Sequence, residues 1–141
     1  MDENLYIKAI KLVLSKNNNV NMLLLDEFKL IDENTSIDND NGELIAKSNG
    51  GTLQFENDIN FATYLYQFTI GVLLPQTYEE ETMYAKTSII RKAFRDSNLM
   101  LTDPTVYDIG PIVFSSSSIV QHTDNIQYRE LNFQNTVIER L

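Results

Sequence analysis

The feature that most constrains this fold is a long alternating stretch, residues 61–74, which is followed by Pro75. Every second residue in it is aromatic or aliphatic, namely Tyr64, Tyr66, Phe68, Ile70, Val72 and Leu74. The residues between them are mixed in character. Because successive side chains of a strand point to opposite faces, the alternation predicts a β-strand with one buried face. Its length predicts a central place in a sheet.

Two segments have apolar residues at spacings of three and four, which predicts helices over residues 4–16 and 78–97. The first apolar stripe contains Tyr6, Ala9, Ile10, Val13 and Leu14. The second contains Met83, Thr87, Ile90, Ala93 and Phe94. Three asparagines, residues 17–19, end the first helix because asparagine competes for backbone hydrogen bonds. Thr77 and Glu80 fit a capping box at the start of the second helix.

Several shorter segments predict further strands. Residues 20–25 are mostly apolar and favour a buried strand or the entry to one. Residues 44–46 and 53–56 are typical of the two arms of a hairpin, because Ser48-Asn49-Gly50-Gly51 between them favours a tight turn. The acidic, asparagine-rich residues 26–43 are interpreted as an exposed, mobile loop or as the tip of a long hairpin.

The last part of the chain also favours strands. Residues 106–114 predict a strand that is interrupted at Gly110-Pro111, as at a bulge or an edge. The four serines 115–118 predict a bend or turn. Residues 126–138 alternate, with one face made of Arg129, Leu131, Phe133, Asn135 and Val137. The order helix, strands, helix, strands predicts one α+β domain over residues 1–141, in which two main helices pack on one face of an antiparallel or mixed β-sheet.

Composition excludes several classes of protein. The chain has no cysteine, so disulfides and thiolate chemistry are excluded. No apolar run approaches the roughly 20 residues of a membrane-spanning helix, so no membrane partner is expected. The net charge is −9. Because DNA is held mainly by cations that displace counterions, an acidic chain is expected to meet DNA only as passing cargo.

No set of residues predicts a catalytic, metal or cofactor site. His122 is the only histidine, and a surface position explains it without a metal or a catalytic partner. Residues 38–43 are rich in oxygen ligands, but their glycine does not fall at the position that a calcium-binding EF-hand loop requires. Glu79, Glu80 and Glu81 are explained by the positive end of a helix. The glycines at 50 and 51 lack the lysine of a phosphate-binding loop.

The remaining candidates are charged surfaces that could join protein chains. The second predicted helix carries basic residues that could contact the acidic loop of a neighbouring copy, and the simpler alternative is a solvated helix face. Such a contact between different patches is heterologous, and heterologous contacts can close a ring. The candidate interface residues are Lys86, Arg91, Lys92 and Arg95 on the helix and Asp32, Glu33, Asp38 and Asp40 in the loop.

The order of these features resembles the tail-terminator (tail-completion) proteins of long-tailed bacteriophages. The resemblance covers an N-terminal amphipathic helix, a hairpin region with a long polar loop (20–56), the aromatic strand 61–74, the helix 77–97 and a final strand around 128–133. It implies a virion protein near the head–tail junction. It also implies a hexameric ring that caps the tail tube, stops its polymerisation and presents a surface to head connector proteins, with DNA passing through the lumen.

Three alternatives remain open at this stage. A head–tail connector or adaptor subunit would bind on the portal side. An acidic monomeric module that mimics nucleic acid would bind a basic partner and would not self-associate. An enzyme is the least favoured class, because no residues converge on a reaction.

Overall fold

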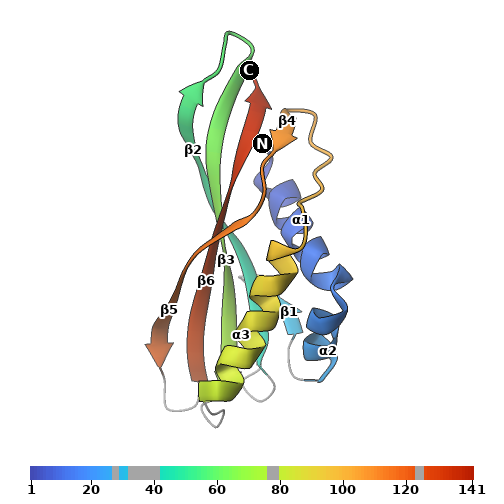
Figure 1. Cartoon of the computed structure of the whole chain (residues 1–141), viewed down its shortest axis with the longest axis vertical. Helices are drawn as coiled ribbons and strands as arrows, with labels where there is room; N and C mark the ends of the chain where they lie inside the picture. Colours follow the sequence, from blue (N-terminus) through green and yellow to red (C-terminus); the bar gives the residue numbers. More distant parts are fainter. Residues whose placement is uncertain (27–28, 32–41, 76–79, 123–125) are drawn as a thin grey trace.

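The alternating stretch forms β3 (Phe61–Pro75), which lies in the middle of a tall, twisted sheet (Figure 1). The computed structural model describes residues 1–26, 29–31, 42–75, 80–122 and 126–141. The other elements in these residues are α1 (Glu3–Lys16), α2 (Asn18–Asp26), β1 (Lys29–Ile31), β2 (Glu43–Glu56), α3 (Glu80–Arg95), β4 (Val106–Ile109), β5 (Val113–His122) and β6 (Ile126–Arg140).

The sheet has the order β1-β2-β3-β6-β4, and β5 also pairs with β6. β3 and β6 form an uninterrupted antiparallel ladder from Phe61 opposite Arg140 to Pro75 opposite Ile126. The pairs described are antiparallel except β1 with β2, which is parallel, so the sheet is mixed. The predicted α+β class is therefore confirmed, with the helices on one face of the sheet and α2 added to the two expected (Figure 1).

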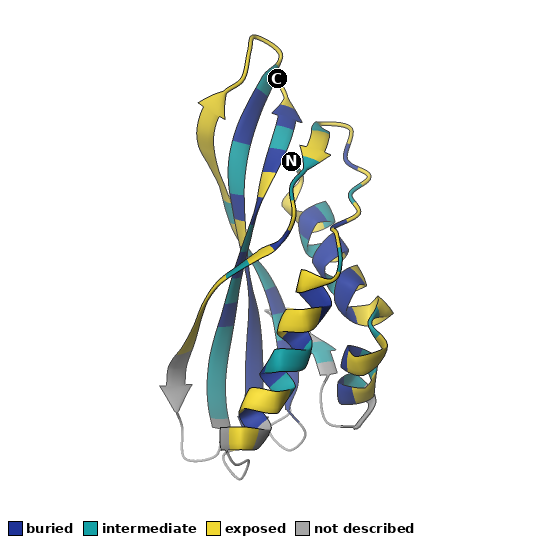
Figure 2. Cartoon of the chain, in the orientation of Figure 1, coloured by how far each residue is buried: buried dark blue, intermediate teal, exposed yellow. Residues whose placement is uncertain are grey.

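The core lies between the helices and the inward face of the sheet (Figure 2). Phe68 is fully buried at its centre, with its ring 5.1 Å from the rings of both Phe94 on α3 and Phe133 on β6. The predicted stripes of both helices and the predicted inward faces of β3 and β6 are confirmed by this burial, apart from Arg129 and Tyr64, which are only partly buried. These contacts between aromatic rings stabilise the core beyond the contribution from burying the surface of the rings.

The predicted strand over residues 20–25 is wrong, because this segment forms α2. The side chain of Asn17 accepts hydrogen bonds from the backbone N–H groups of Asn19 and Val20, both at 3.1 Å. Asn17 also ends α1. An asparagine that closes one helix thus caps the next one, and this satisfies N–H groups that a helix start leaves unpaired. Val20 and Leu23 are buried at a spacing of three.

The predicted hairpin turn at residues 48–51 is also wrong. β2 runs through it as one strand, with a bulge between Ser48 and Gly51, and Gly50 has a φ of 85°. A Cβ on Gly51 would lie 2.5 Å from the ring of Tyr66. The glycine therefore leaves room for that ring to pack over the backbone of β2. Residues 53–56 therefore continue the strand that begins at 43, and the hairpin turn lies at residues 57–60.

Three smaller expectations are corrected or limited. The serines 115–118 lie within β5 as exposed strand residues, so a turn there is wrong, whereas the expected strand bend fits the shift in register between Phe114 and Ser116. Part of the expected acidic loop is ordered: residues 29–31 form β1, and Glu43 is buried at the start of β2. The capping box at Thr77 lies outside the described residues, whereas the break at Gly110-Pro111 is confirmed between β4 and β5.

Polar contacts hold the first two residues of the chain against the segment before β4 and against the C-terminal end of β6. The backbone N–H of Asp2 donates to Asp103 at 2.8 Å, and the amino group of Met1 pairs with Glu139. Asp103 also accepts from the backbone N–H and the hydroxyl of Thr105. These hydrogen bonds, first of all that from Asp2, hold the pKa of Asp103 below its usual value.

We expect Phe68→Ala to lower the free energy of unfolding by about 3–5 kcal/mol, because it removes a fully buried ring from the core. Phe55→Ala is the matched control, since that ring is 58% exposed, and its effect should stay within about 0.5 kcal/mol. Urea unfolding followed by circular dichroism measures both. Equal losses in the two variants would contradict the position of the core.

The lowered pKa of Asp103 predicts how stability depends on pH. A carboxyl group whose folded pKa is lowered stabilises the fold at pH values above its unfolded pKa, about 3.9. That contribution is lost as the pH falls through the folded pKa. We therefore expect Asp103→Asn to be less stable than the natural chain near neutral pH, and the gap to narrow in acid. Thermal melts over a pH series measure this, and a gap that stays constant with pH would contradict it.

Candidate assembly surface

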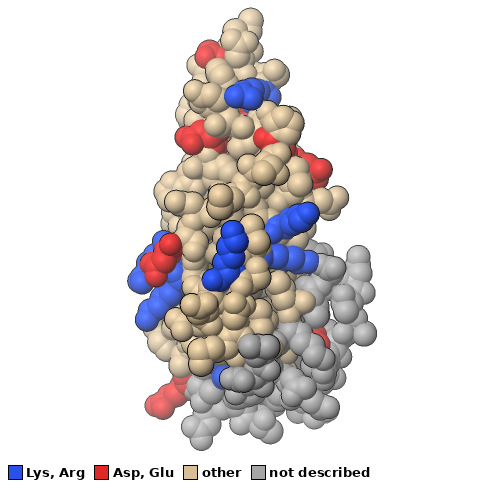
Figure 3. Space-filling view, turned by 90° about the vertical axis from the view of Figure 1, so that its right-hand side faces the viewer, with Lys and Arg blue, Asp and Glu red and all other residues tan. Residues whose placement is uncertain are grey.

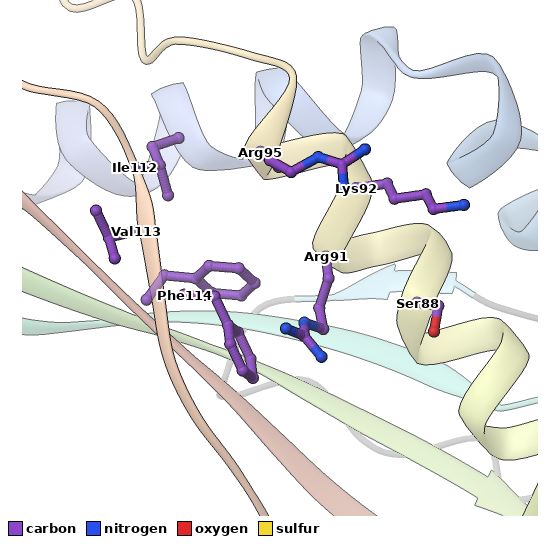
Figure 4. Close-up of a pocket in the computed structure, with 8 residues that line it drawn as sticks. Ser88, Arg91, Lys92, Arg95, Ile112, Val113 and Phe114 are labelled. Carbon is purple, nitrogen blue, oxygen red and sulfur yellow. The ribbon is translucent and has the colours of Figure 1, made fainter.

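A groove of about 440 Å³ lies between α3 and the segment that enters β5 (Figure 4). Its walls combine cationic and apolar side chains. The lining residues are Ser88, Arg91, Lys92, Arg95, Ile112, Val113, Phe114 and Phe133. Three of the four basic residues that the sequence singled out therefore come together here, whereas Lys86 does not line the groove.

The helix positions the basic side of the groove. Ile90, Ala93 and Phe94 face the core, so the residues between them on α3 point outwards. Arg91, Lys92 and Arg95 are exposed, in or next to the last turn of the helix. Cations are favourable at that end of the helix macrodipole. Figure 3 shows Lys and Arg side chains gathered in a band across the helical side of the molecule.

The apolar floor comes from the segment after Gly110-Pro111. The ring of Phe114 packs edge-on against Phe133, at 5.5 Å between centroids, which joins the floor to the core. The guanidinium of Arg91 lies 3.7 Å above the Phe114 ring (Figure 4). Such a cation–π contact stabilises by about 0.5–1 kcal/mol at an exposed site. It holds Arg91 over the floor as part of the groove wall.

Within the described residues, one acid, Asp96, pairs with the cations at the edge (the rim) of the groove. Arg95 pairs with its neighbour Asp96 at 3.1 Å, but both side chains are more than 60% exposed. Exposed ion pairs contribute little, so Arg95 can exchange this partner for another acid. The acidic half of the predicted contact, Asp32, Glu33, Asp38 and Asp40, lies outside the described residues.

A second surface, which the sequence reasoning missed, lies at the tip of the β2–β3 hairpin. Ile59 is 87% exposed there, and other large apolar side chains around this end of the molecule are also exposed: Leu53, Phe55, Tyr107 and Leu141. Exposed acids lie among them, at Glu56, Asp58 and Asp108, together with the base Arg140. The sequence did contain a signal for this exposed residue, because Ile59 stands among the turn-forming residues of Asn57-Asp58-Ile59-Asn60.

Two buried tyrosines of the core donate hydrogen bonds to polar residues of β6. Tyr6 donates to Asn135 at 2.5 Å, and Tyr66 donates to Glu139 at 2.9 Å. Burial raises the pKa of both tyrosines well above the usual value, and for Tyr66 the hydrogen bond to Glu139 raises it further. Both phenols therefore stay protonated near neutral pH and act as hydrogen-bond donors. We interpret this cluster as structural.

The described residues contain no group of three or more histidine, cysteine or acidic side chains placed to hold a metal ion. His122 lies at the end of β5. No helix in the described parts of the chain is long and apolar enough to cross a membrane.

No protein-family model matches the sequence, and no curated protein matches it either. Solved structures do share the fold. One is a chain in a structure described as the virion of a native gene transfer agent particle, with a TM-score of 0.67 and 14% sequence identity. The match covers 94% of this chain and 92% of the other. At that identity the likeness establishes a common fold.

Proposed function

We propose that this protein is a structural subunit of a phage-like virion and works by assembly, not by catalysis. The observation that carries the proposal is the match in fold to a chain of a gene transfer agent virion, which extends over nearly the full length of both chains. The exposed apolar tip and the basic groove support the same proposal, because contiguous exposed apolar groups mark sites of protein contact.

The proposed form is a ring, with six subunits in the simplest case, that caps the tail tube and offers a surface to head connector proteins. The order of elements that resembles the tail terminators supports this form. The observed fold keeps that order from α1 through β3 and α3 to β6. The net charge of −9 supports a passage in which DNA slides without being held.

The test is to purify the protein and tail tubes of the same particle and to examine both by negative-stain electron microscopy. We expect rings of the protein alone or on contact with tubes. We also expect tubes that grow in its presence to stop at a ring. Rings that bind only portal complexes would favour a connector subunit instead. A strictly monomeric protein that ignores both would contradict the proposal.

Charge reversal in the groove tests whether this surface serves assembly. We expect the double variant Arg91→Glu and Arg95→Glu to weaken self-association while the melting temperature changes little, because both residues are exposed. Light scattering measures the mass and a thermal melt measures the fold. Lys8→Glu with Lys16→Glu, at exposed positions on α1, is the matched control. Self-association at the natural strength in a double variant that stays folded would refute this role.

A further inference from the structure

The hairpin tip and the groove are complementary in both charge and apolar character. The tip (residues 53–59) presents Phe55 and Ile59 with Glu56 and Asp58 beside them. The groove presents an apolar floor under the cations Arg91, Lys92 and Arg95. We propose that the hairpin tip of one copy docks in the α3–β5 groove of the next copy. This inference rests on the proposed function in one respect, that copies of the chain assemble.

The tip is built to bind without reordering. The carboxylate of Asp58 accepts from the backbone N–H groups of Asn60 at 2.6 Å and Phe61 at 3.1 Å. The backbone N–H of Leu141 donates to the carbonyl of Asn60 at 2.7 Å, which joins the end of β6 to the turn. Asn57 accepts from the hydroxyl of Thr63. A loop that is already fixed loses less conformational entropy on binding, so more of its contact energy appears as affinity.

The groove has the size and the chemistry to receive this tip. Its volume of about 440 Å³ admits a few side chains, and Val113 on its wall is half exposed. Burial of an exposed isoleucine or phenylalanine side chain removes apolar surface from water and so favours binding. The acids of the tip would meet the rim cations, which selects the orientation of docking. Ile59, at 87% exposure, is the apolar side chain with most to gain from such a contact.

The two surfaces lie in different places, which determines the symmetry of the contact. The tip forms one end of the long axis, whereas the groove lies on the helical side below it (Figure 1). Figure 3 shows several acids above the basic band, towards the narrow end, together with a basic side chain, and further acids beside and below the band. A contact between different patches is heterologous, so a joined pair still has one free tip and one free groove to join further copies. Such a contact closes into a ring when the rotation between copies allows it.

Because the sequence has no cysteine, disulfides can form only between cysteines that are introduced, and this allows a test by crosslinking. The double variant Ile59→Cys with Val113→Cys should, on oxidation, give a ladder of disulfide-linked oligomers beyond the dimer on a non-reducing gel. Each single variant should give at most a small amount of dimer. Ile59→Cys with Gln67→Cys is the matched control, because Gln67 is exposed on the face of the sheet away from the helices. Thermal melts of the reduced proteins confirm that each variant folds.

A charge exchange gives a second, reversible readout. Glu56 is exposed on β2, whereas Asp58 makes the hydrogen bonds of the turn, so the charge of Glu56 can be reversed while those hydrogen bonds are kept. We expect Glu56→Lys or Arg95→Glu alone to raise the dissociation constant of the assembly about tenfold. The two together should restore it to within about threefold of the natural value. Analytical ultracentrifugation measures all three.

The outcomes separate this inference from the proposed function. A ladder with charge rescue supports the docking even if the rings do not cap tubes. Rings that cap tubes but give no ladder refute the docking and leave the proposed function intact. Dimers from the Ile59→Cys single variant at the level of the double variant would show tip-to-tip contact and refute the docking. A chain that stays monomeric at all concentrations refutes it as well.

Discussion

The contact of Phe133 with three other rings holds the structure together and also builds its candidate surface. Its ring lies 5.1 Å from Phe68 and 4.8 Å from Phe94, which joins β6 to β3 and to α3. The Phe133 ring also contacts the ring of Phe114, and the guanidinium of Arg91 lies over the Phe114 ring. Because interiors are close-packed, a change in this cluster is transmitted to its neighbours. The shape of the groove therefore depends on the same contacts that stabilise the fold.

The elements that the sequence predicted well are those that bury a periodic stripe of their own. The alternation in β3 and β6 and the helical spacing in α1 and α3 each place one face on the core. Residues 20–25 failed because a short apolar run does not distinguish a strand from a helix. The choice is made by Asn17, whose side chain caps α2, so the helix depends on a residue before the apolar run.

The surfaces were harder to predict because they depend on contacts between distant segments. The three cations Arg91, Lys92 and Arg95 could be found from their place on a helix face. Nothing in the sequence placed Phe114 under Arg91, since that contact needs the register of β5 on β6. The glycines at 50 and 51 are typical of a turn, yet they serve a bulge over which the Tyr66 ring crosses. That error moved the hairpin tip away from residues 57–60 and hid the exposure of Ile59.

An acidic chain with one basic groove has a physical reason to use both charge and apolar contact in assembly. A net charge of −9 makes copies repel one another in most orientations. In the proposed docking the basic groove would reverse that repulsion, so charge would favour the docking orientation and oppose random aggregation of the exposed tip. Salt screens exposed charges over about 10 Å at 0.1 M, whereas burial of Ile59 and Phe55 would be little affected. In the proposed docking, charge therefore determines which surfaces meet, and apolar burial determines how long they stay together.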